Sequence, residues 1–123
     1  MKLLIIDDEP LIRRSLLRAF VSAGHQVVEA EDGHTGLDLW QSESPDLIFI
    51  DVLMPGMTGP EVIQNASQEL KDRTQIIMMS AFTGKESADS TISLGTDLFL
   101  RKPFEDIFSI VKMAEEVFLN GRK

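Results

Sequence analysis

The segment Asp46-Leu-Ile-Phe-Ile-Asp51-Val-Leu-Met-Pro-Gly-Met-Thr-Gly59 contains the strand around which the rest of the chain is organised. Residues 47–50 are all apolar, and Asp51 follows them at the start of a loop rich in Gly and Pro. A short apolar run between turn residues is typical of a strand buried on both faces, as in a parallel sheet. Ligands of open α/β folds bind beyond the carboxyl ends of such strands. Asp51 is a candidate site residue, because a purely structural buried aspartate would need donors around it and the chain supplies further acids instead.

Four more short apolar runs predict strands at residues 3–6, 26–30, 75–79 and 97–100. Segments with helical spacing of apolar residues follow the strands, over residues 10–23, 35–42, 60–70, 84–94 and 104–119. Strands that alternate with helices predict right-handed crossovers and a parallel sheet covered by helices on both faces. We expect one α/β domain over residues 1–123, because no linker, repeat or low-complexity segment interrupts this pattern.

The composition excludes several classes of function. The net charge of −8 and the pI near 4.6 argue against binding of nucleic acid or of an anionic membrane by this domain. Cysteine is absent, which excludes disulfides and cysteine-based zinc sites. No apolar run has the length of a membrane span or of a signal-peptide core. We expect a soluble, cytoplasmic protein.

Polar side chains stand where four of the predicted strands end. Asp7 and Asp8 follow the first strand, Asp51 the third, Ser80 the fourth and Lys102 the fifth. The carboxyl ends of parallel strands meet at one edge of a sheet, so we expect these residues to converge near the point where the strand order reverses. A single acid at a strand end is unremarkable, but acids, a hydroxyl and a lysine together indicate a site.

The three carboxylates predict a cation site. Two carboxylates about 4 Å apart repel by roughly 4 kcal/mol at an effective dielectric constant of about 20. Such a cluster therefore retains a proton or recruits a cation. The donors are hard oxygens and neither histidine falls at a strand end, which favours Mg²⁺, or Mn²⁺ in its place. Lys102 adds a compact positive charge that suits a phosphoryl oxygen or a pairing with Asp51.

The chain resembles the bacterial response-regulator receiver domain in four sequence motifs, and the resemblance spans essentially the whole chain. They are Asp7-Asp8, the stretch 51–59, Ser80-Ala81 and Lys102-Pro103-Phe104. The resemblance implies a doubly wound, flavodoxin-like (βα)5 fold with strand order 2-1-3-4-5. It also implies a phospho-acceptor of two-component signalling, which takes a phosphoryl group from a sensor histidine kinase or a phosphotransfer protein. Such a domain modifies itself in a Mg²⁺-dependent reaction and is not a turnover enzyme.

The same resemblance implies roles for the metal-binding residues. Asp51 is expected to accept the phosphoryl group. Asp8 and Asp51 are expected to bind Mg²⁺ directly, Asp7 mostly through water, and Leu53 through its backbone carbonyl.

Three further residues complete the site that the resemblance implies. Ser80 is expected to hydrogen-bond one phosphoryl oxygen, Lys102 to pair with another, and Phe99 to occupy the position of the family's switch aromatic. Ser80 would move toward the phosphoryl group and vacate space that Phe99 fills. This change is expected to alter the face made by residues 84–94, 97–100 and 104–119, which would then bind a partner or form a homodimer.

Two other functions compete with the phospho-acceptor. A Mg²⁺-dependent phosphohydrolase with Asp51 as nucleophile would need a second acid two residues later, where Leu53 stands and cannot donate a proton. A phosphorylation-independent interaction module of the same fold would not need all five polar residues. A nucleotide-binding Rossmann domain is disfavoured, because no glycine-rich loop follows Ile6.

Two groups of residues outside the site carry further predictions. The first helix carries three basic residues off its apolar stripe, Arg13, Arg14 and Arg18. They form either a docking face for the kinase or simply a solvated face. His25 and His34 are expected in turns, facing solvent.

The last helix has more apolar surface than one face needs. Its core-facing stripe is expected to include Phe108 and Val111, and a second stripe is formed by Ile110, Met113 and Val117. The second stripe has two possible explanations. It is a surface for a dimer or for another partner, or the chain is a receiver that has been separated from its output domain. The chain is accordingly either a complete single-domain regulator or the N-terminal receiver of a longer protein, and its output is not predicted.

Overall fold

The computed structural model describes residues 1–81, 96–102, 104 and 106–121. The elements in chain order are β1 (Lys2–Ile6), α1 (Pro10–Ser22), β2 (Gln26–Ala30), α2 (Gly33–Glu43), β3 (Leu47–Asp51), α3 (Gly59–Asn65), α4 (Gln68–Arg73), β4 (Gln75–Ser80), β5 (Leu98–Arg101) and α6 (Ile107–Asn120). Each strand agrees with its predicted boundaries to within one residue. The predicted helix over residues 84–94 lies outside the described residues. In the part of the chain that the structure describes, no helix combines the length and the apolar character that a bilayer span requires.

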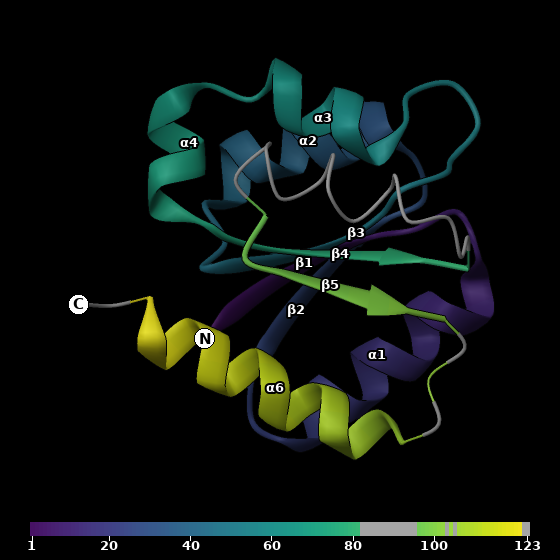
Figure 1. The fold of residues 1–123 in the computed structure, drawn as a ribbon, viewed down its shortest axis with the longest axis vertical. Coiled ribbons are helices and arrows are strands. Elements are labelled where there is room, and N and C mark those ends of the chain that lie inside the picture. Colours follow the sequence, from purple (N-terminus) through teal and green to yellow (C-terminus); the bar gives the residue numbers. More distant parts are fainter. Residues whose placement is uncertain (82–95, 103, 105, 122–123) are drawn as a thin grey trace.

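The five strands form one parallel sheet in the order β2-β1-β3-β4-β5 (Figure 1). This confirms the doubly wound, flavodoxin-like architecture. All five residues of the central strand β3 are buried, as its continuous apolar run predicts. The chain passes from β1 outward to β2 and then returns to β3 on the other side of β1. The strand order therefore reverses between β1 and β3, where open sheets bind their ligands.

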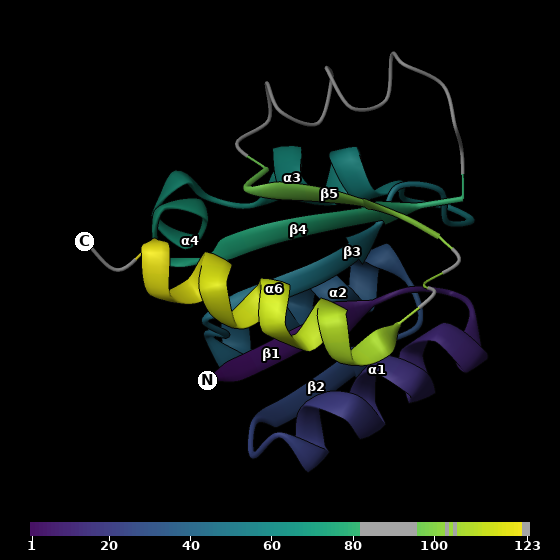
Figure 2. The same ribbon diagram turned by 60° about the horizontal axis from the view of Figure 1, so that its bottom comes forward.

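Helices cover both faces of the sheet, and the alternation of side chains along the strands supplies two cores (Figures 1 and 2). Leu3 and Ile5 of β1 point to the face covered by α1 and α6. Leu4 and Ile6 point to the opposite face, which is covered by α2, α3 and α4. This period of two is the geometry of a strand, and it buries every apolar residue of β1.

Large aromatic side chains fill both cores. Phe20 of α1 packs against Phe49 of β3 with ring centroids 5.4 Å apart and a tilt of 55°. Trp40 of α2 is fully buried on the other face, and its Nε1–H donates a hydrogen bond of 2.9 Å to Thr74 Oγ1. Burial of each such ring stabilises the fold by about 1.5–3 kcal/mol. The hydrogen bond avoids the cost of an unpaired buried indole N–H.

The helix predicted over residues 60–70 is wrong as a single element. The structure has α3 and α4 instead, because Ala66 adopts an extended conformation with φ −76° and ψ 145°. Ser67 then begins α4 as its N-cap, and its hydroxyl accepts a hydrogen bond of 3.2 Å from the Leu70 N–H. A serine at this position satisfies an N–H group that the new helix would otherwise leave unpaired.

The predicted faces of the last helix are only partly correct: Val111 is buried in the core as expected, but other positions differ. Helix α6 begins three residues later than expected, with Asp106 as its N-cap. Ile110, assigned to an outer stripe, is buried against α1 and the sheet, and Met113 and Val117 are partly buried there as well. Phe108, assigned to the core, is 69% exposed. The second apolar stripe therefore packs against the core and is not a separate outer face of the helix.

His25 does not simply face solvent, contrary to the prediction. The Met1 ammonium donates a hydrogen bond of 3.0 Å to His25 Nδ1, and the Nε2–H of the same ring donates one of 2.8 Å to Glu115 Oε2 on α6. The ring also lies 6.0 Å from that of Phe20. The turn between α1 and β2 is thus attached to α6. His34 is exposed, as predicted, but it lies in helix α2 and not in a turn.

Candidate functional site

The carboxyl ends of four strands bring the predicted polar residues to one edge of the sheet. Asp7 follows β1, and the parallel register of β1 with β3 places it beside Asp51 at the end of β3. Ser80 ends β4, and its carbonyl accepts a hydrogen bond of 2.9 Å from the backbone N–H of Lys102, which follows β5. Residues far apart in the chain are therefore held together by strand pairing alone.

Asp7, Asp8 and Asp51 form an acidic cluster. One carboxylate oxygen from each lies within 4.8 Å of the other two. Asp7 is fully buried and Asp51 is only 4% exposed, whereas Asp8 is exposed. The cluster therefore reaches from the end of the sheet to the solvent at Asp8.

Lys102 faces this cluster and is itself almost completely buried. Its Nζ lies 2.7 Å from Asp7 Oδ2, 2.7 Å from Glu9 Oε1 and 3.4 Å from Asp51 Oδ2. The ammonium donates a hydrogen bond to Glu9. It also forms ion pairs with Asp7 Oδ2 and Asp51 Oδ2. One cation is thus shared by three carboxylates.

The burial of these charges shifts their protonation. Burial raises the pKa of Asp51 to about 6; repulsion from Asp7 adds to this effect and attraction to Lys102 opposes it. Burial likewise raises the pKa of Asp7, in spite of its contact with Lys102. Burial alone would lower the pKa of Lys102, but its contacts with Asp7 and Glu9 outweigh burial and raise it. Lys102 therefore remains charged, while the carboxylates of Asp7 and Asp51 hold protons more readily than exposed ones.

The acidic cluster has the chemistry of a site for a hard divalent cation. It carries more negative charge than Lys102 neutralises, and its three carboxylates lie close enough together to share one ion. A cation at this point would offset this charge and reduce the repulsion from Asp7 that adds to the effect of burial on the pKa of Asp51. Carboxylate oxygens suit Mg²⁺ and Mn²⁺ better than soft metals.

The loop after β3 is fixed against the backbone of Asp51 by Gly59. The Gly59 N–H donates a hydrogen bond of 2.9 Å to the Val52 carbonyl. A Cβ atom on Gly59 would collide with the Asp51 carbonyl oxygen. Thr58 and Glu61 then form a capping box that starts α3. These contacts explain why glycine is needed at this position and why the loop returns so closely to Asp51.

Two residues of the site are not predicted from the sequence. Glu9 contacts Lys102, and its backbone N–H donates a hydrogen bond of 2.9 Å to Asp7 Oδ1. Arg13 Nη1 donates a hydrogen bond of 2.7 Å to the Asp7 carbonyl, and its Nε contacts Glu29 at 3.4 Å. The run of three acids before Pro10 is the only sequence signal for Glu9. The interpretation of Arg13 as part of a free docking face is wrong, because this side chain holds the loop between β1 and α1.

The remaining predicted residues lie around the cluster at different depths. Leu53 is 58% exposed in the loop after β3. Ser80 is 1% exposed at the end of β4. Phe99 is partly buried in β5, where it pairs with Met78 and packs against the core under α2 and α3. The structure therefore brings Asp7, Asp8, Asp51 and Lys102 into one charged cluster and places Ser80 at the same edge, whereas Phe99 is part of the hydrophobic core below that edge.

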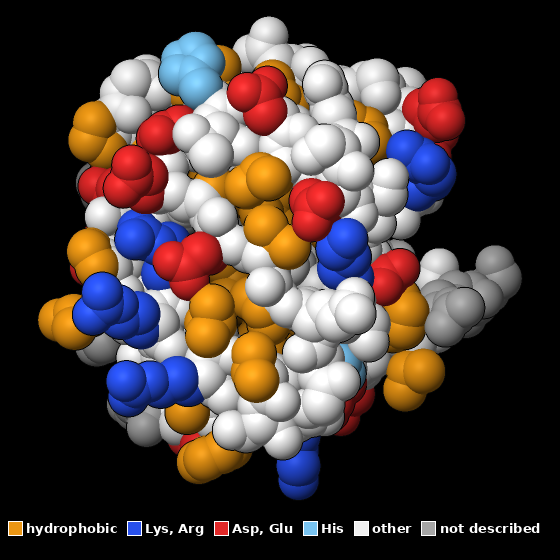
Figure 3. Space-filling view, turned by 180° about the vertical axis from the view of Figure 1, so that it is seen from behind, with side chains coloured by type: hydrophobic (Ala, Val, Ile, Leu, Met, Phe, Trp, Pro, Cys, Tyr) orange, Lys and Arg blue, Asp and Glu red, His pale blue; other side chains and the backbone are white. Residues whose placement is uncertain are grey.

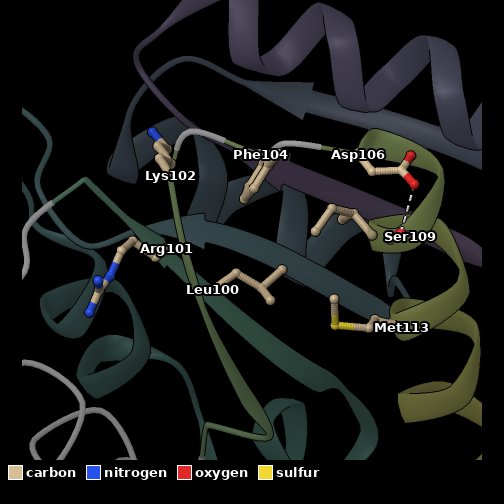
Figure 4. Close-up of a pocket in the computed structure, with 8 residues that line it drawn as sticks. Leu100, Arg101, Lys102, Phe104, Asp106, Ser109 and Met113 are labelled. Atoms are coloured by element: carbon tan, nitrogen blue, oxygen red, sulfur yellow. Dashed lines mark hydrogen bonds between the residues drawn. The ribbon is translucent and has the colours of Figure 1, made fainter.

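A groove of about 530 Å³ lies between β5 and α6, next to the charged cluster (Figure 4). Leu100, Phe104 and Met113 contribute apolar side chains to it. Figure 4 shows the Lys102 ammonium pointing away from Met113 and the start of α6. Lys102 thus belongs to both the groove and the charged cluster, but the groove offers apolar side chains, whereas the cluster consists of charged ones.

Comparison with known proteins identifies the family. The family model of the response regulator receiver domain matches residues 3–115. The chain is 37% identical to the Probable transcriptional regulator ycf27 of Cyanophora paradoxa over 103 residues, which are 84% of this chain and 42% of that protein. The chain belongs to the response regulator receiver domain family. It spans about two fifths of the length of this relative.

Solved structures agree with this assignment. The chemotaxis protein CheY4 of Vibrio cholerae superposes with a TM-score of 0.87 at 32% identity, over 94% of this chain and 97% of that chain. The response regulator protein TrrA of Thermotoga maritima, solved in complex with Mg²⁺-BeF, superposes with a TM-score of 0.80 at 29% identity, over 94% and 97% of the two chains. The fold and the family are thus the same as those predicted from the strand-end motifs.

Proposed function

We propose that this receiver domain is a phospho-acceptor and that Asp51 carries the phosphoryl group. One observation carries the proposal: Asp51 is a nearly buried carboxylate with a lysine ammonium 3.4 Å away and two further aspartates beside it. Phosphoryl transfer requires mainly positioning and charge around the transferred oxygens, which this arrangement offers. Membership of the receiver family supports the same role.

Each residue has a defined part in the transfer. An Asp51 carboxylate oxygen forms a bond to phosphorus while the bond between phosphorus and the donor's leaving atom breaks. Lys102 pairs with one phosphoryl oxygen and the Ser80 hydroxyl donates a hydrogen bond to another. Asp51 attacks as the carboxylate, and with its pKa at about 6 it is mostly ionised at neutral pH.

We propose that Asp8 and Asp51 hold Mg²⁺, or Mn²⁺, directly, with Asp7 acting through water and Leu53 through its backbone carbonyl. The cation, when bound, neutralises charge that develops on the phosphoryl oxygens. The acidic cluster supports this assignment, because one carboxylate oxygen from each of its three aspartates lies within 4.8 Å of the other two. The complex of TrrA with Mg²⁺-BeF supports it by analogy.

The donor is a phosphohistidine on a sensor histidine kinase or a phosphotransfer protein. Arg14 and Arg18 are exposed on α1, whereas Arg13 is engaged within the domain. Figure 3 shows basic side chains gathered over the α1 side of the molecule, among hydrophobic and acidic ones. We propose this side as the docking face for the donor, with Arg14 at its centre.

The domain acts once on itself and is not a turnover enzyme. Leu53, at the position where an aspartate phosphohydrolase needs a general acid, is an exposed aliphatic residue. A phosphorylation-independent interaction module is disfavoured, because such a module would have no use for a lysine shared among buried carboxylates.

The output is a change of surface around β5 and α6. Ser80 approaches the phosphoryl group, and Phe99 repacks into the space that it leaves. The groove between β5 and α6 then binds a partner or a second copy of the chain. We propose residues 1–123 as one receiver domain of the cytoplasm, either alone or joined to an output domain.

Intact-mass measurement after incubation with acetyl phosphate tests the function. Incubation with Mg²⁺ should add the mass of one phosphoryl group, and incubation with EDTA should not. Asp51→Asn should show no adduct, whereas Asp38→Asn, an exposed aspartate on α2, should react like the wild type. An adduct of equal yield in the Asp51→Asn protein would refute the assignment.

A further inference from the structure

Glu9 occupies the N-cap position of α1, but its side chain does not cap the helix. No side-chain hydrogen bond of the capping kind is present, and the Glu9 carboxylate instead accepts a hydrogen bond of 2.7 Å from Lys102 Nζ. The Glu9 backbone is fixed at the same time by its N–H bond to Asp7 Oδ1. The side chain is therefore directed across the site toward a residue that follows the last strand.

Glu9 and Asp51 compete for the same ammonium group. Lys102 Nζ lies 2.7 Å from Glu9 Oε1 but 3.4 Å from Asp51 Oδ2. A charged hydrogen bond is strongest at the shorter of these distances, so the contact with Glu9 is the stronger one. In the unmodified protein, Lys102 is thus directed in part away from the residue that it must assist.

The three carboxylates around Lys102 differ in how easily they can leave it. Asp7 has no exposed side-chain surface, so its release would leave a buried, unpaired charge. Glu9 is 55% exposed in its side chain, so its carboxylate can return to water at small cost. A phosphoryl group on Asp51 brings a charge of about −1.5 to −2 and three strong acceptor oxygens. Of the two carboxylates closest to Lys102, Glu9 is therefore the one that this group displaces.

We propose that Glu9 is a positioning residue that holds Lys102 away from Asp51 until a phosphoryl group arrives, and that Glu9 is then released to solvent. This inference rests on the phospho-acceptor function proposed above. Its consequence is that Glu9 lowers the affinity of the resting site for phosphoryl groups and slows phosphorylation by small donors. Once a phosphoryl group is present, Glu9 leaves Lys102, and Lys102 can then bind that group.

The Glu9→Gln variant tests this role, with beryllofluoride as a phosphoryl analogue at saturating Mg²⁺. The neutral amide competes less strongly for Lys102, so beryllofluoride should bind about three- to tenfold more tightly and acetyl phosphate should react faster by a similar factor. Glu31→Gln is the matched control, because Glu31 is an exposed acid just after β2 and its substitution changes the net charge equally. This control should stay within about twofold of the wild type.

A spectroscopic readout separates positioning from a general change in stability. The NMR signals of the Lys102 Cε–H groups should differ between wild type and Glu9→Gln when both are free. They should coincide when both hold Mg²⁺ and beryllofluoride, because Glu9 has then left Lys102. Glu9→Asp, whose side chain is one methylene shorter, should resemble Glu9→Gln in the free state although it keeps the charge.

Three results would overturn the proposal: weaker beryllofluoride binding in Glu9→Gln, equal effects of Glu9→Gln and Glu31→Gln, or a difference in the Lys102 signals that persists in the bound state. These results differ from failure of the phospho-acceptor function. If wild type itself neither binds beryllofluoride with Mg²⁺ nor reacts with acetyl phosphate, that function fails. If wild type does both, only the role of Glu9 is in question.

Discussion

Lys102 Nζ lies 3.4 Å from Asp51 Oδ2, and less than a tenth of either side chain is exposed. Asp51 ends β3 and Lys102 follows β5, and the elements α3, α4, β4 and β5 lie between them in the chain. Two opposite charges that are almost completely buried stabilise each other, because each lowers the free-energy cost of burying its partner. Removal of the Lys102 charge would leave two buried carboxylates without a cation, whereas neutralisation of Asp51 would leave Lys102 paired with Asp7 and Glu9. The two substitutions should therefore change stability in opposite directions.

Lys102→Met should destabilise the protein at pH 7.5 by about 3 kcal/mol or less, because it leaves the Asp7 and Asp51 carboxylates buried without their cation. The loss should be smaller at pH 5, which lies below the Asp51 pKa of about 6, because protonation of Asp51 removes part of the unpaired charge. Urea denaturation without Mg²⁺ at both pH values measures it. Unchanged stability at pH 7.5 would contradict the ion-pair geometry.

Asp51→Asn should stabilise the metal-free protein at neutral pH. The pKa of Asp51 is raised from 3.8 to about 6, so the folded state binds the proton more tightly than the unfolded state does. Its contribution to stability is fully present below about pH 4 and is lost as the pH rises through 6. Asparagine cannot ionise, so at pH 7.5 the variant should gain about 1–3 kcal/mol.

The gain in the free energy of unfolding of Asp51→Asn should almost disappear at pH 4. A series of urea titrations from pH 4 to 8 would measure this change. Asp38→Asn, on the exposed surface of α2, should show no such dependence. A gain that stays constant across the series would refute the assignment of the raised pKa to Asp51.

Mg²⁺ should stabilise the folded protein, because the cation binds the native acidic cluster and not the unfolded chain. A hundredfold excess over the dissociation constant should add about 2.7 kcal/mol to the free energy of unfolding. Asp8→Asn should reduce this increment, whereas Asp38→Asn should leave it unchanged. Thermal unfolding with and without Mg²⁺ measures the difference, and equal increments in the two variants would exclude Asp8 as a ligand.

Glu115→Gln should weaken the attachment of α6 to the turn between α1 and β2. The carboxylate accepts a hydrogen bond of 2.8 Å from His25, and both groups are partly exposed, so its loss should cost about 0.5–1 kcal/mol. Glu116→Gln is the control, because Glu116 is exposed on the same helix. Equal urea midpoints for the two variants would show that the His25 contact contributes nothing.

Gly59→Ala should disturb both the loop and Asp51, because its methyl group would meet the Asp51 carbonyl oxygen. We expect a destabilisation of about 1–3 kcal/mol and slower phosphorylation of the fraction that folds. Denaturation together with the rate of acetyl phosphate modification measures both effects. A folded variant of wild-type stability would mean that the backbone at this position has room to move.

The strands and the charged cluster could be predicted from the sequence because both depend on local patterns. Continuous apolar runs such as residues 47–50 indicate strands buried on both faces, and polar residues that follow such runs converge by strand pairing. The helices were less predictable. Ala66 is compatible with a helix, and Ser67, which caps α4, is the one local signal of the break between α3 and α4; a single serine is too weak a signal to divide a segment with helical spacing.

The remaining differences arise from contacts between residues distant in the chain. Both Phe108 and Ile110 are apolar, and the phase of α6 is decided only by its cap at Asp106 and its packing against α1. The partners of Glu9 and His25 lie 93 and 90 residues away. A local pattern in the sequence does not encode such pairings, whereas the sheet topology brings them about.

Localisation of the phosphoryl group tests the central claim most directly. After incubation with acetyl phosphate and Mg²⁺, borohydride reduction converts an aspartyl phosphate to homoserine, which peptide mass spectrometry can assign to one position. We expect homoserine at position 51 in the presence of Mg²⁺ and none when EDTA is added. Conversion at Asp7, Asp8 or another carboxylate, with Asp51 intact, would contradict this expectation.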